Sequence, residues 1–131
     1  DGGHGGIEKG SVGLSRTCEK DVNLAISRYL MKLLEEEGAN VVMSRIDDHK
    51  VGLYERVNIA KENNALISVS IHNNALPIGK NPYTNHGTEV HYYNENAKLL
   101  AETIKNDLLN KMSENLINKQ YIELNKKKIL K

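Results

Sequence analysis

The feature that most constrains the fold is the alternation of two hydrophobic periods along the chain. In three segments the apolar side chains recur at three- and four-residue steps, which predicts helices over residues 21–37, 52–63 and 95–112. Short apolar runs rich in β-branched residues lie beside these segments and predict strands over residues 40–44, 65–71 and 88–93. Helices that alternate with strands are typical of layered folds, so the sequence predicts an α/β domain.

The expected core is aliphatic, because the chain has no Phe and no Trp. The first helix has the longest apolar stripe, and we expect it to bury Ile26, Leu30 and Leu33. Gly38 follows that helix at the position where a C-terminal stop is expected. Asn94 precedes the third helix and is a favourable residue to cap it.

Length and charge limit the classes of protein that this chain can represent. A chain of 131 residues fits one domain, residues 1–131. Its 18 basic and 17 acidic side chains give a net charge of +1, which excludes a strongly basic nucleic-acid-binding protein. No apolar run is long enough to cross a membrane. Lysines dominate residues 113–131, and we interpret this end as a solvated tail rather than as a patch for nucleic acid or membrane.

Three segments place polar groups where strands or helices end, which is where α/β folds carry their sites. The chain opens on Asp-Gly-Gly-His-Gly-Gly, in which the glycines allow close backbone approach and His4 is the single imidazole. Glu19 and Asp21 lie at the start of the first predicted helix, and His72 follows a predicted buried strand. Simpler interpretations stay open: the first segment as a flexible surface loop, and the acidic pair as a complement to the helix dipole.

Together these segments suggest a metal site. Two imidazoles and one carboxylate with an open fourth position form a known ligand set of catalytic zinc. His4 and His72 would be neutral donors and Glu19 the anionic one, which leaves a net positive charge to acidify a bound water. The separations of 15 and 53 residues fit no local metal-binding motif, so on residue chemistry alone zinc is one hypothesis among others.

Six blocks of sequence add a resemblance to this chemistry. Residues 1–6 are similar to Asp-Pro-Gly-His-Gly-Gly, with Gly2 in the place of proline, and residues 19–25 read Glu-Lys-Asp-Val-Asn-Leu-Ala. The remaining blocks are Ser44–Asp48, similar to Thr-Arg-x-x-Asp, then Leu53-x-x-Arg56, the Ser-Ile-His-x-Asn signature at Ser70–Asn74, and Gly87–Tyr93. Over residues 1–112 the chain thus resembles the zinc-dependent N-acetylmuramoyl-L-alanine amidases of bacterial peptidoglycan metabolism.

The resemblance implies a fold, a site and a reaction. The fold would be a three-layer α/β/α domain with a mostly parallel central sheet, incomplete because its first strand and its C-terminal catalytic segment are missing. The zinc ligands would be His4, Glu19 and His72. The reaction would be hydrolysis of the amide between N-acetylmuramic acid and the L-alanine of the stem peptide. The family's general base is a glutamate in a Val-Glu-x-Gly-Phe segment that the 131 residues do not contain, so we expect this chain to be an impaired amidase.

Further candidate residues come from the same blocks. Glu89 is a glutamate in the last of these blocks and is a candidate to replace the missing base. Asn74, Arg45 and Arg56 are candidates to bind the stem peptide, although ion pairs of the two arginines with neighbouring carboxylates are the simpler interpretation. Four more side chains could ligate metal but have no counterpart among the family's ligands, so we expect them not to: Cys18, His49, His86 and His91.

Two other interpretations compete with an amidase. The chain could be a catalytically inactive zinc-containing module that binds or regulates the cell wall machinery, or a non-functional fragment. The family acts outside the cytoplasmic membrane, so the resemblance implies an autolysin-like hydrolase of the cell envelope or the extracellular space. A signal peptide would precede residue 1.

Overall fold

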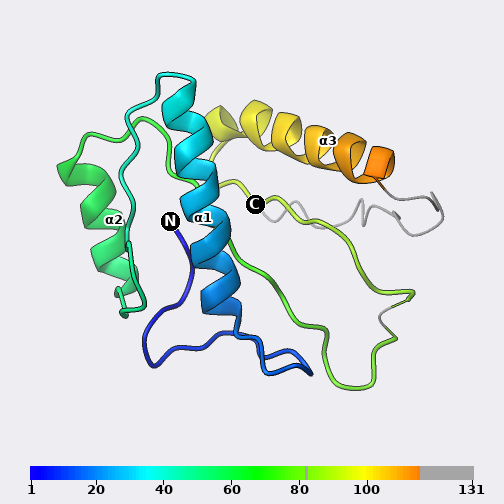
Figure 1. Cartoon of the computed structure of the whole chain (residues 1–131). Coiled ribbons are helices and arrows are strands. Elements are labelled where there is room, and N and C mark those ends of the chain that lie inside the picture. Colours follow the sequence, from blue (N-terminus) through cyan, green and yellow to red (C-terminus); the bar gives the residue numbers. More distant parts are fainter. Residues whose placement is uncertain (82, 116–131) are drawn as a thin grey trace. The chain divides into compact units, whose positions relative to one another are not determined.

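The structure is a computed structural model that describes residues 1–81 and 83–115 of the chain. Its helices, in chain order, are α1 (Glu19–Glu36), α2 (Leu53–Glu62), the 3-10 helix η1 (Glu95–Ala97) and α3 (Lys98–Asn115), as Figure 1 shows. The three predicted helices are confirmed, with ends displaced by no more than three residues. The chain forms two compact units, Asp1–Ala75 and Leu76–Lys131. Most of the predicted lysine-rich tail lies outside the described residues.

Helix α1 ends in a Schellman motif. The amide of Gly38 donates to the carbonyl of Glu35 at 3.0 Å, and the amide of Ala39 donates to the carbonyl of Leu34 at 2.9 Å. Gly38 has a φ of +88°, in the left-handed region that glycine adopts without a steric penalty. The stop predicted at Gly38 is therefore confirmed.

Helix α2 is bounded by local hydrogen bonds at both ends. At its start, the amide of Gly52 donates to the carboxylate of Glu55 at 3.2 Å. At its end, Asn64 takes a left-handed conformation with a φ of +51°, and its amide donates to the carbonyl of Lys61 at 3.0 Å. Asparagine is the residue, after glycine, that most readily adopts this conformation.

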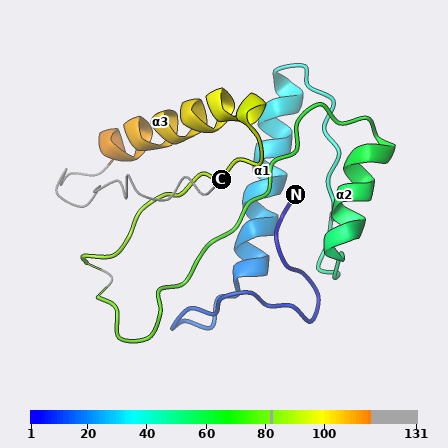
Figure 2. The same cartoon turned by 180° about the vertical axis from the view of Figure 1, so that it is seen from behind.

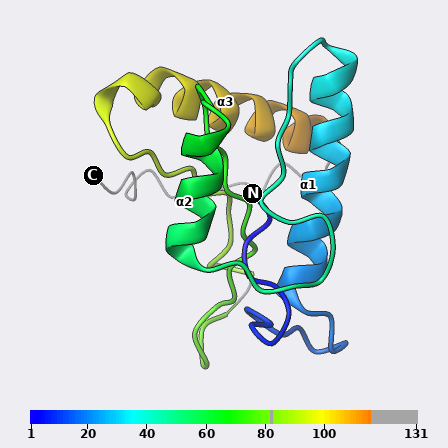
Figure 3. The ribbon, with the colours of Figure 1, turned by 90° about the vertical axis from the view of Figure 1, so that its left-hand side faces the viewer.

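The first residues of the chain run between α1 and α2, as Figures 1 and 2 show from opposite sides and Figure 3 shows from the edge. They pair in parallel with residues 69–71. The amide of Ile71 donates to the carbonyl of Asp1 at 2.9 Å, and the amide of Gly3 donates to the carbonyl of Ile71 at 3.0 Å. This pairing holds the loop that contains His4 beside the segment that leads into His72.

The predicted strands over 40–44, 65–71 and 88–93 are not formed among residues 1–81 and 83–115, so the mostly parallel sheet is not confirmed. A strand requires repeated hydrogen bonds to a neighbouring strand. In the described residues, segment 65–71 has one parallel bridge, between Gly2 and Ile71. The direction of that bridge agrees with a parallel sheet, but one bridge does not make a ladder.

Helix α1 turns its polar face inward, and the expected burial of its apolar stripe is wrong. Ile26 and Leu33 are each 43% exposed, and Leu30 is half-buried. The side chains of α1 that are buried are polar and recur at every fourth position: Glu19, Asn23 and Ser27. Hydrogen bonds between this polar face and the first residues set the rotation of the helix, which leaves the apolar stripe on the outer side of the first unit.

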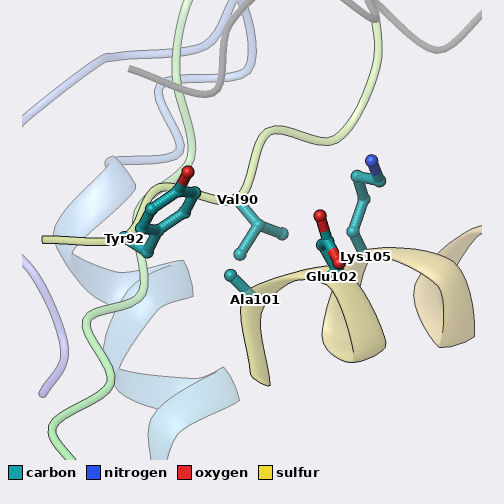
Figure 4. A pocket seen from close by; sticks show the side chains of 5 residues that line it. All are labelled: Val90, Tyr92, Ala101, Glu102 and Lys105. Carbon is teal, nitrogen blue, oxygen red and sulfur yellow. The ribbon is translucent and has the colours of Figure 1, made fainter. Parts of the chain in front are cut away.

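The second unit is built around η1 and α3. The side chain of Asn94 accepts a hydrogen bond from the amide of Ala97 at 3.2 Å, so the predicted cap is confirmed, although it caps η1 rather than α3 directly. Ala101 is buried in α3. A small hollow surrounds it, and Figure 4 shows the side chains that line this hollow: Val90, Tyr92, Ala101, Glu102 and Lys105.

Among the helices of the described residues, none combines the length and the apolar character that a membrane span requires.

Candidate metal centre

The structure brings the three predicted metal ligands together. Glu19 Oε1 lies 3.3 Å from His4 Nε2 and 3.0 Å from His72 Nδ1. One ligand atom from each residue can be chosen so that all three lie within 4.8 Å of one another. The two imidazole rings meet edge to face, with their centroids 4.9 Å apart. Three segments far apart in the sequence therefore converge on one carboxylate oxygen.

Glu19 is the buried member of this cluster. Its side chain is 5% exposed, compared with 31% for His4 and 47% for His72. Burial raises the pKa of the Glu19 carboxyl, but hydrogen bonds from the amides of Ser11 and Asn73, together with the contact to His72, more than offset this effect and lower the pKa to about 2. Glu19 is therefore anionic at neutral pH, as a metal ligand must be.

Glycines of the first loop, which comprises the residues that precede α1, make room for the side chains of the three candidate metal ligands. A Cβ atom on Gly3 would lie 2.3 Å from Cε1 of His72, and one on Gly10 would lie 2.6 Å from both Glu19 Oε2 and His4 Cδ2. His4 itself has a φ of +62°, a conformation that side-chain-bearing residues seldom adopt. Strain of this kind persists only where the surroundings enforce it, and it gathers at functional sites.

Arg45 and Arg56 hold the first loop in place. Arg45 is 1% exposed, and its guanidinium donates to the carbonyls of Gly2, Gly3, Lys20 and Asp47 at 2.8, 3.1, 2.7 and 3.1 Å. Arg56 donates to the carbonyl of Gly2 at 3.0 Å, to that of His4 at 2.8 Å, and to the carboxylate of Asp1. The main contacts of both side chains are therefore main-chain carbonyls rather than the carboxylates next to them in the sequence, and Arg56 forms its ion pair with Asp1.

Asn23 is a further residue of this site, beyond those predicted from the sequence. It is fully buried on α1, one turn after Glu19. Its Nδ2 lies 3.2 Å from the carbonyl of Gly3 and 3.4 Å from Glu19 Oε1, and its Oδ1 accepts a hydrogen bond of 2.8 Å from the side chain of Asn73. The sequence signal that could have predicted a role for Asn23 is its position four residues after Glu19, because residues at that spacing share a helix face.

The chain also matches known proteins. The family model described as N-acetylmuramoyl-L-alanine amidase matches residues 1–129. The chain belongs to this amidase family. It is 42% identical over 116 residues to the uncharacterized protein YqiI of Bacillus subtilis, and this alignment covers 86% of this chain and 53% of YqiI. It is 35% identical over 106 residues to the probable cell wall amidase LytH of Staphylococcus aureus, over 79% of this chain and 33% of LytH.

The fold agrees with that assignment. The structure of the N-acetylmuramoyl-L-alanine amidase AmiC2 of Nostoc punctiforme superposes with a TM-score of 0.75 at 38% identity, over 88% of this chain and 60% of the AmiC2 chain. The chain therefore spans 53% of YqiI, 60% of the AmiC2 chain and 33% of LytH.

The donor set of the amidase-family site fits a zinc ion. Zinc bonds to imidazole nitrogen and carboxylate oxygen are about 2.0–2.2 Å long, so neighbouring ligand atoms in a tetrahedral site lie roughly 3.3–3.6 Å apart. The 3.3 and 3.0 Å separations from Glu19 Oε1 to the two imidazole nitrogens are close to this spacing. The partly exposed side chains of His4 and His72 also leave one side of the cluster open to solvent, which is typical of catalytic rather than structural zinc sites.

Two other candidate residues of the first unit have partners outside this cluster. Cys18 is the N-cap residue of α1, and its thiol is directed to the carbonyl of Arg16. His49 pairs with Asp47. Neither belongs to the group of possible metal ligands in the described residues. In the second unit, Glu89 pairs with His91 at 3.4 Å, and the suggestion that Glu89 serves as a base stays a prediction.

Acid should destabilise the metal-free chain through Glu19. Because folding lowers the pKa of Glu19 from 4.5 to about 2, its ionised form stabilises the folded state above pH 4.5, and this contribution is lost as the pH falls toward 2. The shift corresponds to about 3 kcal/mol. Urea unfolding across this pH range should show a shallower acid limb for Glu19→Gln than for Glu62→Gln, a control at an exposed carboxylate of α2. Equal pH slopes in the two variants would contradict the assignment of this acid destabilisation to Glu19.

Proposed function

We propose that this chain is the zinc-binding part of an amidase that cleaves the amide between N-acetylmuramic acid and the L-alanine of the peptidoglycan stem peptide. The observation that carries the proposal is that the imidazoles of His4 and His72 meet at one carboxylate oxygen of Glu19 in a chain of this family. The name of LytH as a cell wall amidase supports the cell wall as the place of action, and we place this chain in the envelope or outside the cell.

His4 Nε2, Glu19 Oε1 and His72 Nδ1 would hold the zinc ion. When bound, zinc supplies a Lewis acid for the scissile carbonyl and lowers the pKa of water to about 7. The amides of Ser11 and Asn73 keep Glu19 ionised and oriented. The exposed edges of the two imidazoles leave the substrate an approach from solvent.

The remaining roles extend this proposal to the substrate. Asn74 is exposed and follows His72 by two residues, which suits a contact with the stem peptide. Arg45 and Arg56 act on substrate only indirectly, because their guanidinium groups are bonded to the loop that contains His4. Loss of general acid–base catalysis typically costs about 10²–10⁴-fold. Since the 131 residues contain no Val-Glu-x-Gly-Phe segment, we expect hydrolysis by this chain to be slow.

The proposal is tested with purified peptidoglycan and the zinc-loaded chain. The measured quantity is the release of new L-alanine amino groups, and we expect a slow release that stops when zinc is removed with a chelator. His72→Ala should be inactive, whereas His49→Ala, outside the cluster, should match the wild type.

A release that continues unchanged in His72→Ala, or no release above the His72→Ala background, would contradict the proposed function. Fast hydrolysis that Glu89→Gln abolishes would instead assign the general base to Glu89.

A further inference from the structure

We propose that Asn23 is a positioning residue that sets the affinity of the site for metal, by locking the three ligand segments to one another. This inference rests on the proposed metal site and extends it beyond the three ligands. The distinguishing observation is that one fully buried amide reaches α1, the first loop and the segment after residue 71.

The contacts of Asn23 use both ends of its amide. The Nδ2 group donates to the carbonyl of Gly3, the residue before His4, at 3.2 Å. The same nitrogen lies 3.4 Å from Glu19 Oε1, the oxygen that faces both imidazoles. The Oδ1 atom accepts from the side chain of Asn73, the residue after His72, at 2.8 Å. Asn23 thus contacts one ligand and the chain neighbour of each of the other two.

This pattern requires an amide. The carbonyl of Gly3 and the carboxylate of Glu19 are acceptors, and the side-chain nitrogen of Asn73 is a donor, so the central group must offer two N–H donors and one acceptor. A carboxylate would lack the donors, and a hydroxyl could not serve all three partners. Because Asn23 is fully buried, water cannot replace a lost contact without a rearrangement.

The consequence concerns the ligands rather than the fold alone. An imidazole or carboxylate that is free to turn must be ordered again each time metal binds, which weakens the affinity. Loss of an outer residue that orients metal ligands typically costs about 10–100-fold in affinity. We therefore expect Asn23→Ala to weaken zinc binding by this factor, even where the variant is fully folded.

Ser27 provides a matched control. It lies one turn after Asn23 on the same buried face of α1 and is 3% exposed. Its hydroxyl has no hydrogen-bond partner among the described residues. Ser27→Ala therefore removes a buried polar group from the same helix face without breaking a hydrogen bond, and its zinc affinity should equal that of the wild type.

The experiment measures zinc affinity by calorimetric titration of the metal-free full chain, and the free energy of unfolding of each metal-free variant by urea. Weaker zinc binding by Asn23→Ala, with unchanged affinity in Ser27→Ala, supports the proposal. A merely structural role would lower the free energy of unfolding of Asn23→Ala and leave the affinity of the folded chain unchanged, which would overturn it.

Two further results keep the outcomes separate. If Asn23→Ala does not fold, Asn73→Ala takes its place, because Asn73 is exposed and the substitution removes only its side-chain bond to Asn23. Affinity reduced by about tenfold then supports the proposal, and wild-type affinity overturns it. A wild-type chain that binds no zinc refutes the metal site itself, and with it the proposed function, rather than the role of Asn23 alone.

Discussion

Replacement of His72 with alanine is expected to abolish stoichiometric zinc binding by the folded chain. The wild type should bind one zinc ion per chain and retain it through dialysis. His72 supplies one of three ligand atoms, and two protein ligands do not hold zinc in the known structural or catalytic sets. The loss should exceed the 10–100-fold that removal of a supporting residue typically costs. Metal analysis after dialysis, together with calorimetric titration, measures this directly.

His49→Ala is the matched control for this prediction. His49 is also an exposed histidine of the first unit, but it pairs with Asp47 and lies outside the ligand cluster. Its zinc content should equal that of the wild type. Zinc retained by a His4→Ala, His72→Ala double variant would show that the ion binds elsewhere on the chain.

Replacement of Arg45 with methionine is expected to cause a large loss of stability. The side chain is buried, and its guanidinium donates to the carbonyls of Gly2, Gly3, Lys20 and Asp47. Methionine fills a similar volume but offers no donor, so each of these carbonyls loses one hydrogen bond, although those of Gly2 and Gly3 keep Arg56 and Asn23 as donors. Each hydrogen bond lost costs about 0.5–1.5 kcal/mol. We expect the free energy of unfolding in urea to fall by about 3 kcal/mol.

Arg45→Lys separates the charge from the geometry. Lysine keeps the positive charge, but its ammonium cannot copy the planar fork that reaches four carbonyls at once. Its stability should therefore lie closer to that of Arg45→Met than to that of the wild type. If Arg45→Lys is as stable as the wild type, the charge of Arg45 rather than its bond geometry is what the fold requires.

The helices could be predicted from the sequence because their signals are local. An apolar stripe, a cap such as Asn94 and a stop such as Gly38 act within a few residues of one another. The strands depended on partners that no short segment encodes, and segment 65–71 has one bridge in the described residues. The rotation of α1 was also beyond the pattern, because Ile26 and Leu33 make a good apolar stripe but polar contacts of the opposite face position the helix.

The site was predicted in part for the same reason. His4, Glu19 and His72 belong to recognisable blocks, and their residue types already suggest zinc, although their spacing does not. The supporting contacts were hidden because many of them are made with the main chain. Arg45 binds carbonyls, and Glu19 accepts from the amides of Ser11 and Asn73, which have no signature in the side-chain sequence. Of the supporting residues, Asn23 alone had a signal in the sequence, which is its spacing of four residues from Glu19.

The short pairing between Asp1–Gly3 and Val69–Ile71 has a consequence for which chemical group enters the site. Successive side chains of an extended chain point to opposite sides, so a slip of this pairing by one residue would present Ile71 or Asn73 where His72 now meets Glu19. Neither residue can replace an imidazole nitrogen. The few backbone hydrogen bonds of this pairing therefore fix the register of the two segments. They select which side chain of segment 65–75 the site receives, so the proposed zinc chemistry depends on an alignment of the main chain.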